Sequence, residues 1–137
     1  MDADDELDPD YLRAMQPHLP DTNTLLAPYV IYSGKYGRTP AHIPNEGNWP
    51  MSNDAVTGTL ISRQLFERLG GWRQEFWPWP DWELWLRALD QGAEKRHVPG
   101  AIYIAHQHND SANARLSVHA GQALHAKVKR LYPEQFR

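Results

Sequence analysis

The feature that most constrains the fold is a short stretch rich in tryptophan and proline, residues 70–87, which reads GGWRQEFWPWPDWELWLR. It holds five of the six tryptophans of the chain. Pro78 and Pro80 each fix a backbone φ angle, and a proline in the first turn of a helix loses no hydrogen bond. The stretch therefore predicts a rigid aromatic approach to a helix over residues 81–91, with Asp81 at its start.

The sequence leaves two roles open for Asp81. A carboxylate at the start of a helix commonly acts as the N-cap, in which its side chain accepts a backbone N–H. A carboxylate among rigid indoles can also act as a general base toward a sugar hydroxyl, because aromatic faces pack against the apolar faces of sugars. The tryptophan-rich stretch thus indicates a sugar site beside the helix.

Composition limits the remaining choices. The 137 residues are enough for one domain, taken here as residues 1–137. A net charge of −3 without a basic block argues against a nucleic-acid partner. The chain has no cysteine, no apolar run of about 20 residues and an acidic N-terminus. We therefore expect a cytoplasmic protein without a transmembrane segment, a thiolate metal site or a secretory signal.

Hydrophobic patterns and helix caps predict the order of the elements. Asp8 is expected to cap a short helix that ends before Pro20. Strands are predicted over residues 25–33, 56–61, 97–98 and 101–105, the last two around a Pro99–Gly100 turn, with a loop over residues 34–53. Helices are predicted over residues 63–69, 81–91 and 118–131, with Glu83 and Arg87 paired on the outer side of the second. Interleaved strands and helices are typical of an α/β fold.

Acidic and histidine residues form a second pattern. Asp2 and Asp4 alternate in an extended segment, where their carboxylates can present oxygens to a hard divalent cation. Acidic N-termini are also common as solvated tails, and that alternative stays open. His106 and His108 lie in a polar segment, and either imidazole can complete a metal site built on aspartate.

Taken in order, these patterns resemble the inverting glycosyltransferases of the GT-A fold, of the large family-2 type. DADDELDPDYL is similar to the family's DxD motif with its following helix, and TGTLISRQLFERLGGW resembles the acceptor-side segment. PDWELWLRAL resembles the helix that carries the catalytic base, and IYIAHQHNDSANAR resembles the C-terminal segment with its histidine. The four segments keep the family's order and cover most of residues 2–115.

The resemblance implies a donor site at the two ends of the matched region. Asp2 matches the aspartate near the ribose of the donor, and Asp4 matches the one that coordinates Mn²⁺ (or Mg²⁺) on the donor diphosphate. Of the two histidines, His106 fits the family's position better by spacing, and His108 is the rival. We therefore count all four as candidate metal ligands, with Asp2 and Asp4 also binding the donor.

The resemblance also implies an acceptor site. Asp81 matches the catalytic base, although Pro80 stands where the family has a further acid, so Asp81 must act alone. Trp72 is expected to line the acceptor pocket, and we add Trp79 and Gly58 as candidate substrate-binding residues. The implied partners are a nucleotide-sugar donor and a glycan or other hydroxyl acceptor.

A departure at the front qualifies these expectations. Met1 stands where the family has its nucleotide-binding half, so we expect a partial GT-A domain that lacks this half. The chain is then a glycosyltransferase completed by a second polypeptide, a non-catalytic carbohydrate-binding remnant, or a decayed gene product. Because the missing half would leave apolar surface uncovered, we also expect homo-oligomers.

Overall fold

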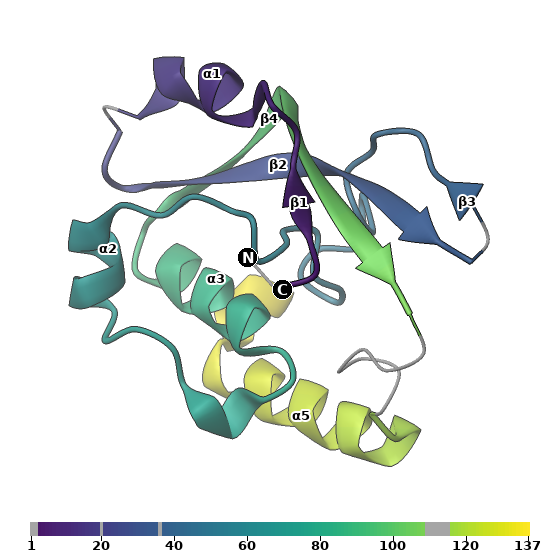
Figure 1. Ribbon diagram of the computed structural model, residues 1–137. Coiled ribbons are helices and arrows are strands. Elements are labelled where there is room, and N and C mark those ends of the chain that lie inside the picture. The colour runs from purple at the N-terminus through teal and green to yellow at the C-terminus, as the bar shows by residue number, and fades with distance from the viewer. Residues whose placement is uncertain (1–2, 20, 36, 109–115) are drawn as a thin grey trace.

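A mixed β-sheet forms the middle layer of the molecule, and helices cover both of its faces (Figure 1). The computed structural model describes residues 3–19, 21–35, 37–108 and 116–137. The strands are β1 (Glu6–Leu7), β2 (Thr24–Gly34), β3 (Gly37–Arg38) and β4 (Glu94–Gln107). The helices are α1 (Tyr11–Met15), α2 (Arg63–Arg68), α3 (Pro80–Asp90) and α5 (Val118–Leu131), with 3-10 turns η1 (Gln16–His18), η2 (Gln74–Phe76) and η3 (Pro133–Phe136). The predicted α/β class is confirmed at this level.

The long strands β2 and β4 make the centre of the sheet. The strand order is β1-β4-β2-β3, and β2 runs parallel to β4 from the Thr24–Glu94 pair to the Gly34–Gln107 pair. β1 and β3 are short and pair antiparallel with β4 and β2. Because parallel neighbours need a crossover connection, the chain between β2 and β4 carries α2 and α3 across one face of the sheet (Figure 1). The strand predicted over residues 25–33 is confirmed as β2.

β4 corrects the prediction of two short strands around a turn. It is one strand, in which the pairing with β2 jumps from Val98, opposite Pro28, to Ile102, opposite Tyr29. The three residues between Val98 and Ile102 form a bulge, and Gly100 takes a φ of +85° there. Proline and glycine interrupt the ladder locally, but the neighbouring strand keeps the chain in the sheet.

The strand predicted over residues 56–61 is wrong. Within this segment, Leu60 alone forms a β-bridge, exchanging two backbone hydrogen bonds with Leu26 of 3.0 and 2.9 Å. A turn precedes it, in which the N–H of Thr59 donates to the carbonyl of Val56. The apolar residues of this segment are there for packing and do not extend the sheet.

Alternation along β2 builds two cores on opposite faces of the sheet. Leu25 and Ala27 pack with α2 and α3, in a cluster that includes Leu65, Leu84 and Trp85. Leu26 points to the other face and packs with Tyr11 and Met15 of α1. Alternate side chains of β2 therefore pack against helices on opposite faces of the sheet.

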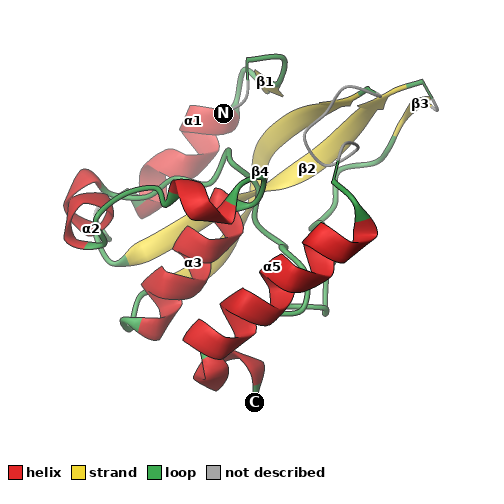
Figure 2. Ribbon diagram, turned by 90° about the horizontal axis from the view of Figure 1, so that it is seen from below, coloured by secondary structure: helices red, strands yellow, loops and turns green. Residues whose placement is uncertain are grey.

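A third core joins α3 to α5 on the side of α3 that faces away from the sheet. Trp82 and Leu86 of α3 pack against Val128 of α5 and against Tyr132 just beyond it. Figure 2 shows α5 lying beside α3. The inner position of α3 overturns the prediction that Glu83 and Arg87 pair on an outer, solvated side, since both are buried, with relative exposures of 0% and 3%.

Local signals set most helix ends. The hydroxyl of Ser62 accepts the N–H of Leu65 at 3.1 Å and caps α2, and Gly92 follows α3 with a φ of +81°. Asp8 is not the predicted cap of α1: its side chain accepts the N–H of Asp10 at 2.9 Å, in an Asx-type turn that delays the helix to Tyr11. In the part of the chain that is described, no helix is both long and apolar enough to cross a membrane.

Candidate functional site

The acidic segment near the N-terminus meets the end of β4. His108 Nε2 lies 2.6 Å from Asp4 Oδ2, and His106 Nε2 lies 3.0 Å from Glu6 Oε1. The two pairs form because β1 aligns antiparallel to β4, with Glu6 opposite Ile104. Residues about a hundred positions apart in the sequence thus form one surface of carboxylates and imidazoles, which we call the acid–histidine junction.

Asp5 fastens this junction to the body of the protein. Its carboxylate accepts the backbone N–H of His106 at 2.8 Å and the hydroxyl of Tyr103 at 2.5 Å. Tyr103 is buried in β4, and its hydroxyl also lies 3.0 Å from that of Thr57. The sequence predicts no role for Asp5 or Glu6, because a run of acidic residues does not indicate which of them points inward.

The electrostatics at the junction favour a charged Asp4. The hydrogen bond from His108, then a hydrogen bond from the backbone of Asp4 itself, lower the pKa of Asp4 below its ordinary value. The positive charges that His108 and His106 carry when protonated act in the same direction. Asp4 is therefore held as a carboxylate oxygen donor.

Two side chains of the junction carry atoms of a kind that metals bind. The Asp4 carboxylate and the His108 imidazole supply an oxygen and a nitrogen atom, donor types that Mn²⁺ accepts. In the structure these two atoms lie 2.6 Å apart in a hydrogen bond with each other. Among the described residues, no three or more histidine and acidic side chains gather as a ligand group. A metal ion there would need further ligands from water or from a bound molecule. Asp2 and residues 109–115 of the histidine segment lie outside the described residues.

Asp81 lies in the first turn of α3. The helix begins at Pro80 with Trp79 at the N-cap position, so Asp81 is not the N-cap. Instead its Oδ2 accepts a hydrogen bond of 3.0 Å from Asn53 Nδ2. Asn53 belongs to the long loop predicted over residues 34–53, and no sequence signal pointed to it. The amide holds the carboxylate in one orientation at a half-buried position.

The loop that carries Asn53 is anchored to β4. Lys95 forms an ion pair of 2.5 Å with Asp54, and its ammonium also lies 3.5 Å from the ring centroid of Trp49. His97 Nε2 approaches the carbonyl of Asp54 at 2.9 Å. Burial lowers the pKa of Lys95, and the hydrogen bond to Asp54 opposes that shift. These contacts position Asn53 beside the start of α3.

The tryptophan-rich stretch divides into a core part and a surface part. Trp82 and Trp85 are buried core residues, with relative exposures of 3% and 1%. Trp72 is 47% exposed and meets the rings of Phe66 and Trp85 edge-on, and Trp77 is 70% exposed. Trp79 is half-buried and stands edge-on to Trp82, 5.9 Å between centroids. Three of the five indoles are thus at least partly exposed.

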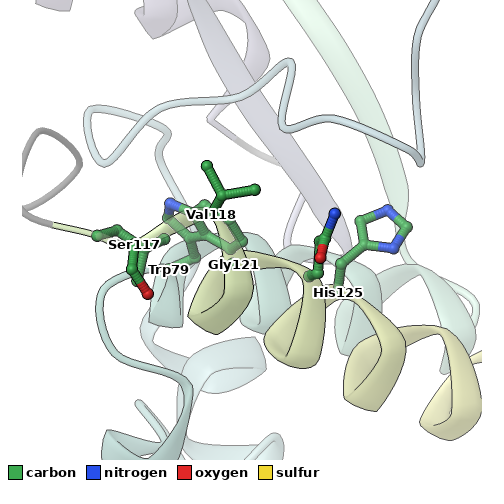
Figure 3. A pocket seen from close by; sticks show the side chains of 7 residues that line it. Trp79, Ser117, Val118, Gly121 and His125 are labelled. Atoms are coloured by element: carbon green, nitrogen blue, oxygen red, sulfur yellow. The ribbon is translucent and has the colours of Figure 1, made fainter.

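Trp79 forms one wall of an open hollow of about 400 Å³ against the start of α5 (Figure 3). Leu116, Val118, Gly121 and His125 supply most of the opposite wall. His125 Nε2 lies 3.2 Å from the carbonyl of Met51, two residues before Asn53. The hollow therefore adjoins the same loop segment that orients Asp81. Gly121 and His125 were not predicted as site residues. For Gly121 the sequence did offer a signal, because a glycine inside an amphipathic helix often has a packing or functional reason.

Gly58 is a packing residue as well as a predicted substrate contact. Its carbonyl accepts the hydroxyl of Tyr11, and a Cβ there would overlap the ring of Tyr103. It is buried, so close approach of Tyr103 accounts for the glycine. A role in substrate binding stays a prediction.

The structure thus brings Asp4, His106 and His108 together, and it sets Asp81 and Trp79 at the start of α3. Comparison with known proteins adds no relative: the chain matches no family model, no curated protein and no solved structure.

Proposed function

We propose that this chain is the catalytic and acceptor-side part of a metal-assisted inverting glycosyltransferase. Its reaction would move a sugar from a nucleoside diphosphate sugar to an acceptor hydroxyl. The observation that carries the proposal is the acid–histidine junction, in which Asp4 meets His108 at 2.6 Å and Glu6 meets His106 at 3.0 Å. A DxD-type segment and a C-terminal histidine must meet if both serve one metal–diphosphate group.

Asp4 and His108 would hold Mn²⁺ or Mg²⁺ on the donor diphosphate, with Asp2 near the donor ribose. His106 is the second histidine candidate, and its side chain pairs with Glu6. When bound, such an ion would neutralise the charge that develops on the leaving diphosphate. Asp5 would act as a positioning residue, because it ties the backbone of His106 to the acidic segment.

Asp81 would act as the general base. Its carboxylate takes the proton of the acceptor hydroxyl while that oxygen bonds to the anomeric carbon and the bond to the diphosphate breaks, which inverts the anomeric centre. Asn53 donates a hydrogen bond to one carboxylate oxygen of Asp81 and holds the carboxylate in one orientation. Trp72 and Trp79 would bind the acceptor on either side of this turn.

A non-catalytic carbohydrate-binding role is the second candidate. The observation that favours it is the exposure of Trp72 and Trp77 and the hollow beside Trp79, since these surfaces can bind sugar without any carboxylate. In that case the contacts of the acid–histidine junction serve only to hold the N-terminal segment against the end of β4.

Replacement of the proposed base separates the two candidates. Asp81→Asn keeps the hydrogen-bonding shape but removes the base, so we expect sugar transfer to fall by about 10²–10⁴-fold while sugar binding changes little. Asp90→Asn is the matched control, because Asp90 is an exposed acid at the other end of α3. Transfer would be followed by release of nucleoside diphosphate with a panel of acceptors. Sugar binding by the parent chain with no transfer would favour the binding role.

Calorimetry with Mn²⁺, UDP and GDP tests the donor side without an acceptor. We expect nucleotide binding that requires Mn²⁺ and is lost in Asp4→Ala. Asp10→Ala is the control, since Asp10 is an exposed acid of the same region whose partner is Arg13. If neither nucleotide binds with Mn²⁺ present, or if Asp4→Ala binds as well as Asp10→Ala, the donor assignment is wrong.

A further inference from the structure

We propose that the hollow between Trp79 and the start of α5 is a subsite for one pyranose ring of the acceptor, a ring other than the one that carries the attacking hydroxyl. The acceptor is then a glycan or glycoside of at least two rings. The identity of this sugar as an acceptor rests on the proposed function, whereas the binding of a sugar ring rests on the hollow itself.

Gly121 is a lining residue of the hollow, and it has no side chain that would project into it. It lies inside the 14-residue helix α5, and its backbone does not adopt a positive φ, so the helix has no conformational need for glycine there. A glycine in a helix interior costs about 0.5–1 kcal/mol relative to alanine. A Cβ at this position would stand 3.3 Å from Trp79 Cη2 and 3.4 Å from Leu116 Cδ2. The glycine therefore lets Trp79 and Leu116 lie close to α5, and a side chain at this position would crowd both of them.

The lining is mainly apolar and carries a few polar groups, and a sugar ring can use both kinds of contact. Trp79 and Val118 offer apolar surface, and Ser117 and Gln122 contribute a hydroxyl and an amide to the lining. A pyranose has the same division, with C–H groups on its faces and hydroxyls around its edge. The volume of about 400 Å³ is near the lower end of small-molecule pockets, which run from about 300 to 1,000 Å³. The hollow is also open, so the hydroxyls of a bound ring keep contact with water.

The indole of Trp79 is held in place before any ligand binds. The backbone N–H of Trp79 donates to the backbone carbonyl of Phe76 at 2.8 Å. The indole ring of Trp79 packs edge-on against the buried ring of Trp82. A fixed aromatic ring loses little conformational entropy when a sugar binds.

The position of the hollow explains why it would hold a second ring. His125, in its wall, contacts the carbonyl of Met51, and Asn53 two residues later contacts Asp81. The hollow and the base therefore lie on either side of the same loop segment, residues 51–53. A ring bound in the hollow would then be separate from the ring that carries the reacting hydroxyl.

The test is a nuclear magnetic resonance titration of the whole chain with methyl glycosides of glucose, galactose, mannose and N-acetylglucosamine, and with their β-linked disaccharides. The reporters are the indole N–H of Trp79, assigned with Trp79→Phe, and the amide of Gly121. We expect saturable shifts of both signals with at least one sugar. Gly121→Val should weaken that binding at least tenfold by filling the hollow. Ala126→Val, at an exposed site of α5 outside the lining, should not.

Three results would overturn the subsite. Sugars would leave both reporters unmoved, or Gly121→Val would bind as well as Ala126→Val, or the apolar probe 1,6-hexanediol would shift the reporters while no sugar did. The last result would assign the hollow to an aliphatic ligand.

The subsite and the proposed function fail separately. Sugar binding at the hollow in a chain that transfers nothing, with Asp81→Asn unchanged in binding, supports the subsite and removes the enzyme. Transfer that depends on Asp81 but has the same KM for a disaccharide acceptor in Gly121→Val and Ala126→Val supports the enzyme and removes the subsite.

Discussion

At the scale of single residues, Glu83 is one of the most heavily hydrogen-bonded side chains among the described residues. Its carboxylate accepts bonds of 3.1 and 2.9 Å from Arg87 and of 3.2 Å from Arg73, together with the hydroxyl of Tyr132. Arg87 in turn donates to the carbonyls of Leu69 and Gly71, which follow α2. Burial first, and then the bond to Glu83, raise the pKa of Tyr132 well above its ordinary value. Glu83 thus joins α3 to α2 and to the C-terminal turn, and it is not a spare base.

Removal of this carboxylate should be costly. Glu83→Ala leaves Arg87 buried without its counter-charge, so we expect a loss of about 3–5 kcal/mol in the free energy of unfolding. Glu67→Ala is the control, because Glu67 also pairs with an arginine four residues away, at 3.7 Å, but on an exposed surface. We expect that change to stay within about 0.5 kcal/mol. Urea unfolding of both variants measures the difference, and comparable losses would contradict the role of Glu83.

Tyr11 should make stability depend on alkaline pH. Burial raises its pKa from the ordinary 10 to about 12. The unfolded chain releases this proton near pH 10 while the folded chain keeps it, so the contribution to stability is complete below pH 10 and is lost as the pH rises toward 12. The loss is at most about 1.4 kcal/mol per pH unit for one proton. Tyr11→Phe should flatten the fall of unfolding free energy between pH 10 and 12, and an unchanged slope would contradict this assignment.

At the scale of elements, the sequence predicted those whose boundaries depend on nearby residues. The helix over residues 63–69 follows from Ser62 and the two glycines after it, and the last helix was predicted with the bounds that α5 has, Val118–Leu131. The strand over residues 25–33 follows from its β-branched and aromatic residues. These signals lie within a few positions of the element that they define, so a single sequence is enough to predict these elements.

The missed elements depend on distant neighbours. β4 continues through Pro99 and Gly100 because β2 pairs on both sides of the bulge, and the sequence around the turn does not show this. Glu83 and Arg87 have an ordinary surface pattern, and distant segments bury them, namely the residues that follow α2 and the C-terminal turn at Tyr132. In the candidate site, the Asp4–His108 contact matched the expected grouping, whereas Asn53 lies on a loop whose course no local pattern defines.

The cap of α2 gives a test at this scale. Ser62 accepts the N–H of Leu65 and donates to the carbonyl of Thr22 at 2.7 Å, so it joins the helix to the segment before β2. Ser62→Ala should reduce the free energy of unfolding by about 1–2 kcal/mol. Ser62→Thr retains the hydroxyl and should recover most of that loss. Equal stabilities of the two variants in thermal unfolding would show that the cap contributes little.

At the scale of the whole molecule, the surface predicts self-association. Large apolar side chains are exposed at several places, among them Trp77 at 70% and Val118 at 79%. We expect light scattering at micromolar concentration to give the mass of a dimer or a larger assembly. Trp77→Ser, which removes one of these side chains, should shift the distribution toward smaller species if Trp77 lies in the contact. A monomeric parent chain at that concentration would contradict the prediction.

The arrangement of the sheet also bears on how the chain is made. β2 ends at Gly34, and its parallel partner β4 begins only at Glu94, so a ribosome must add about 60 residues before the two can pair. At synthesis rates of about 5–20 residues per second, that delay is about 3–12 s. During this time β2 lacks its long parallel partner and has only the short β3 at its end, and Pro28 at its middle hinders the stacking of one nascent chain on another. The order in which the strands emerge therefore makes β2 the segment of this protein that most needs protection during translation.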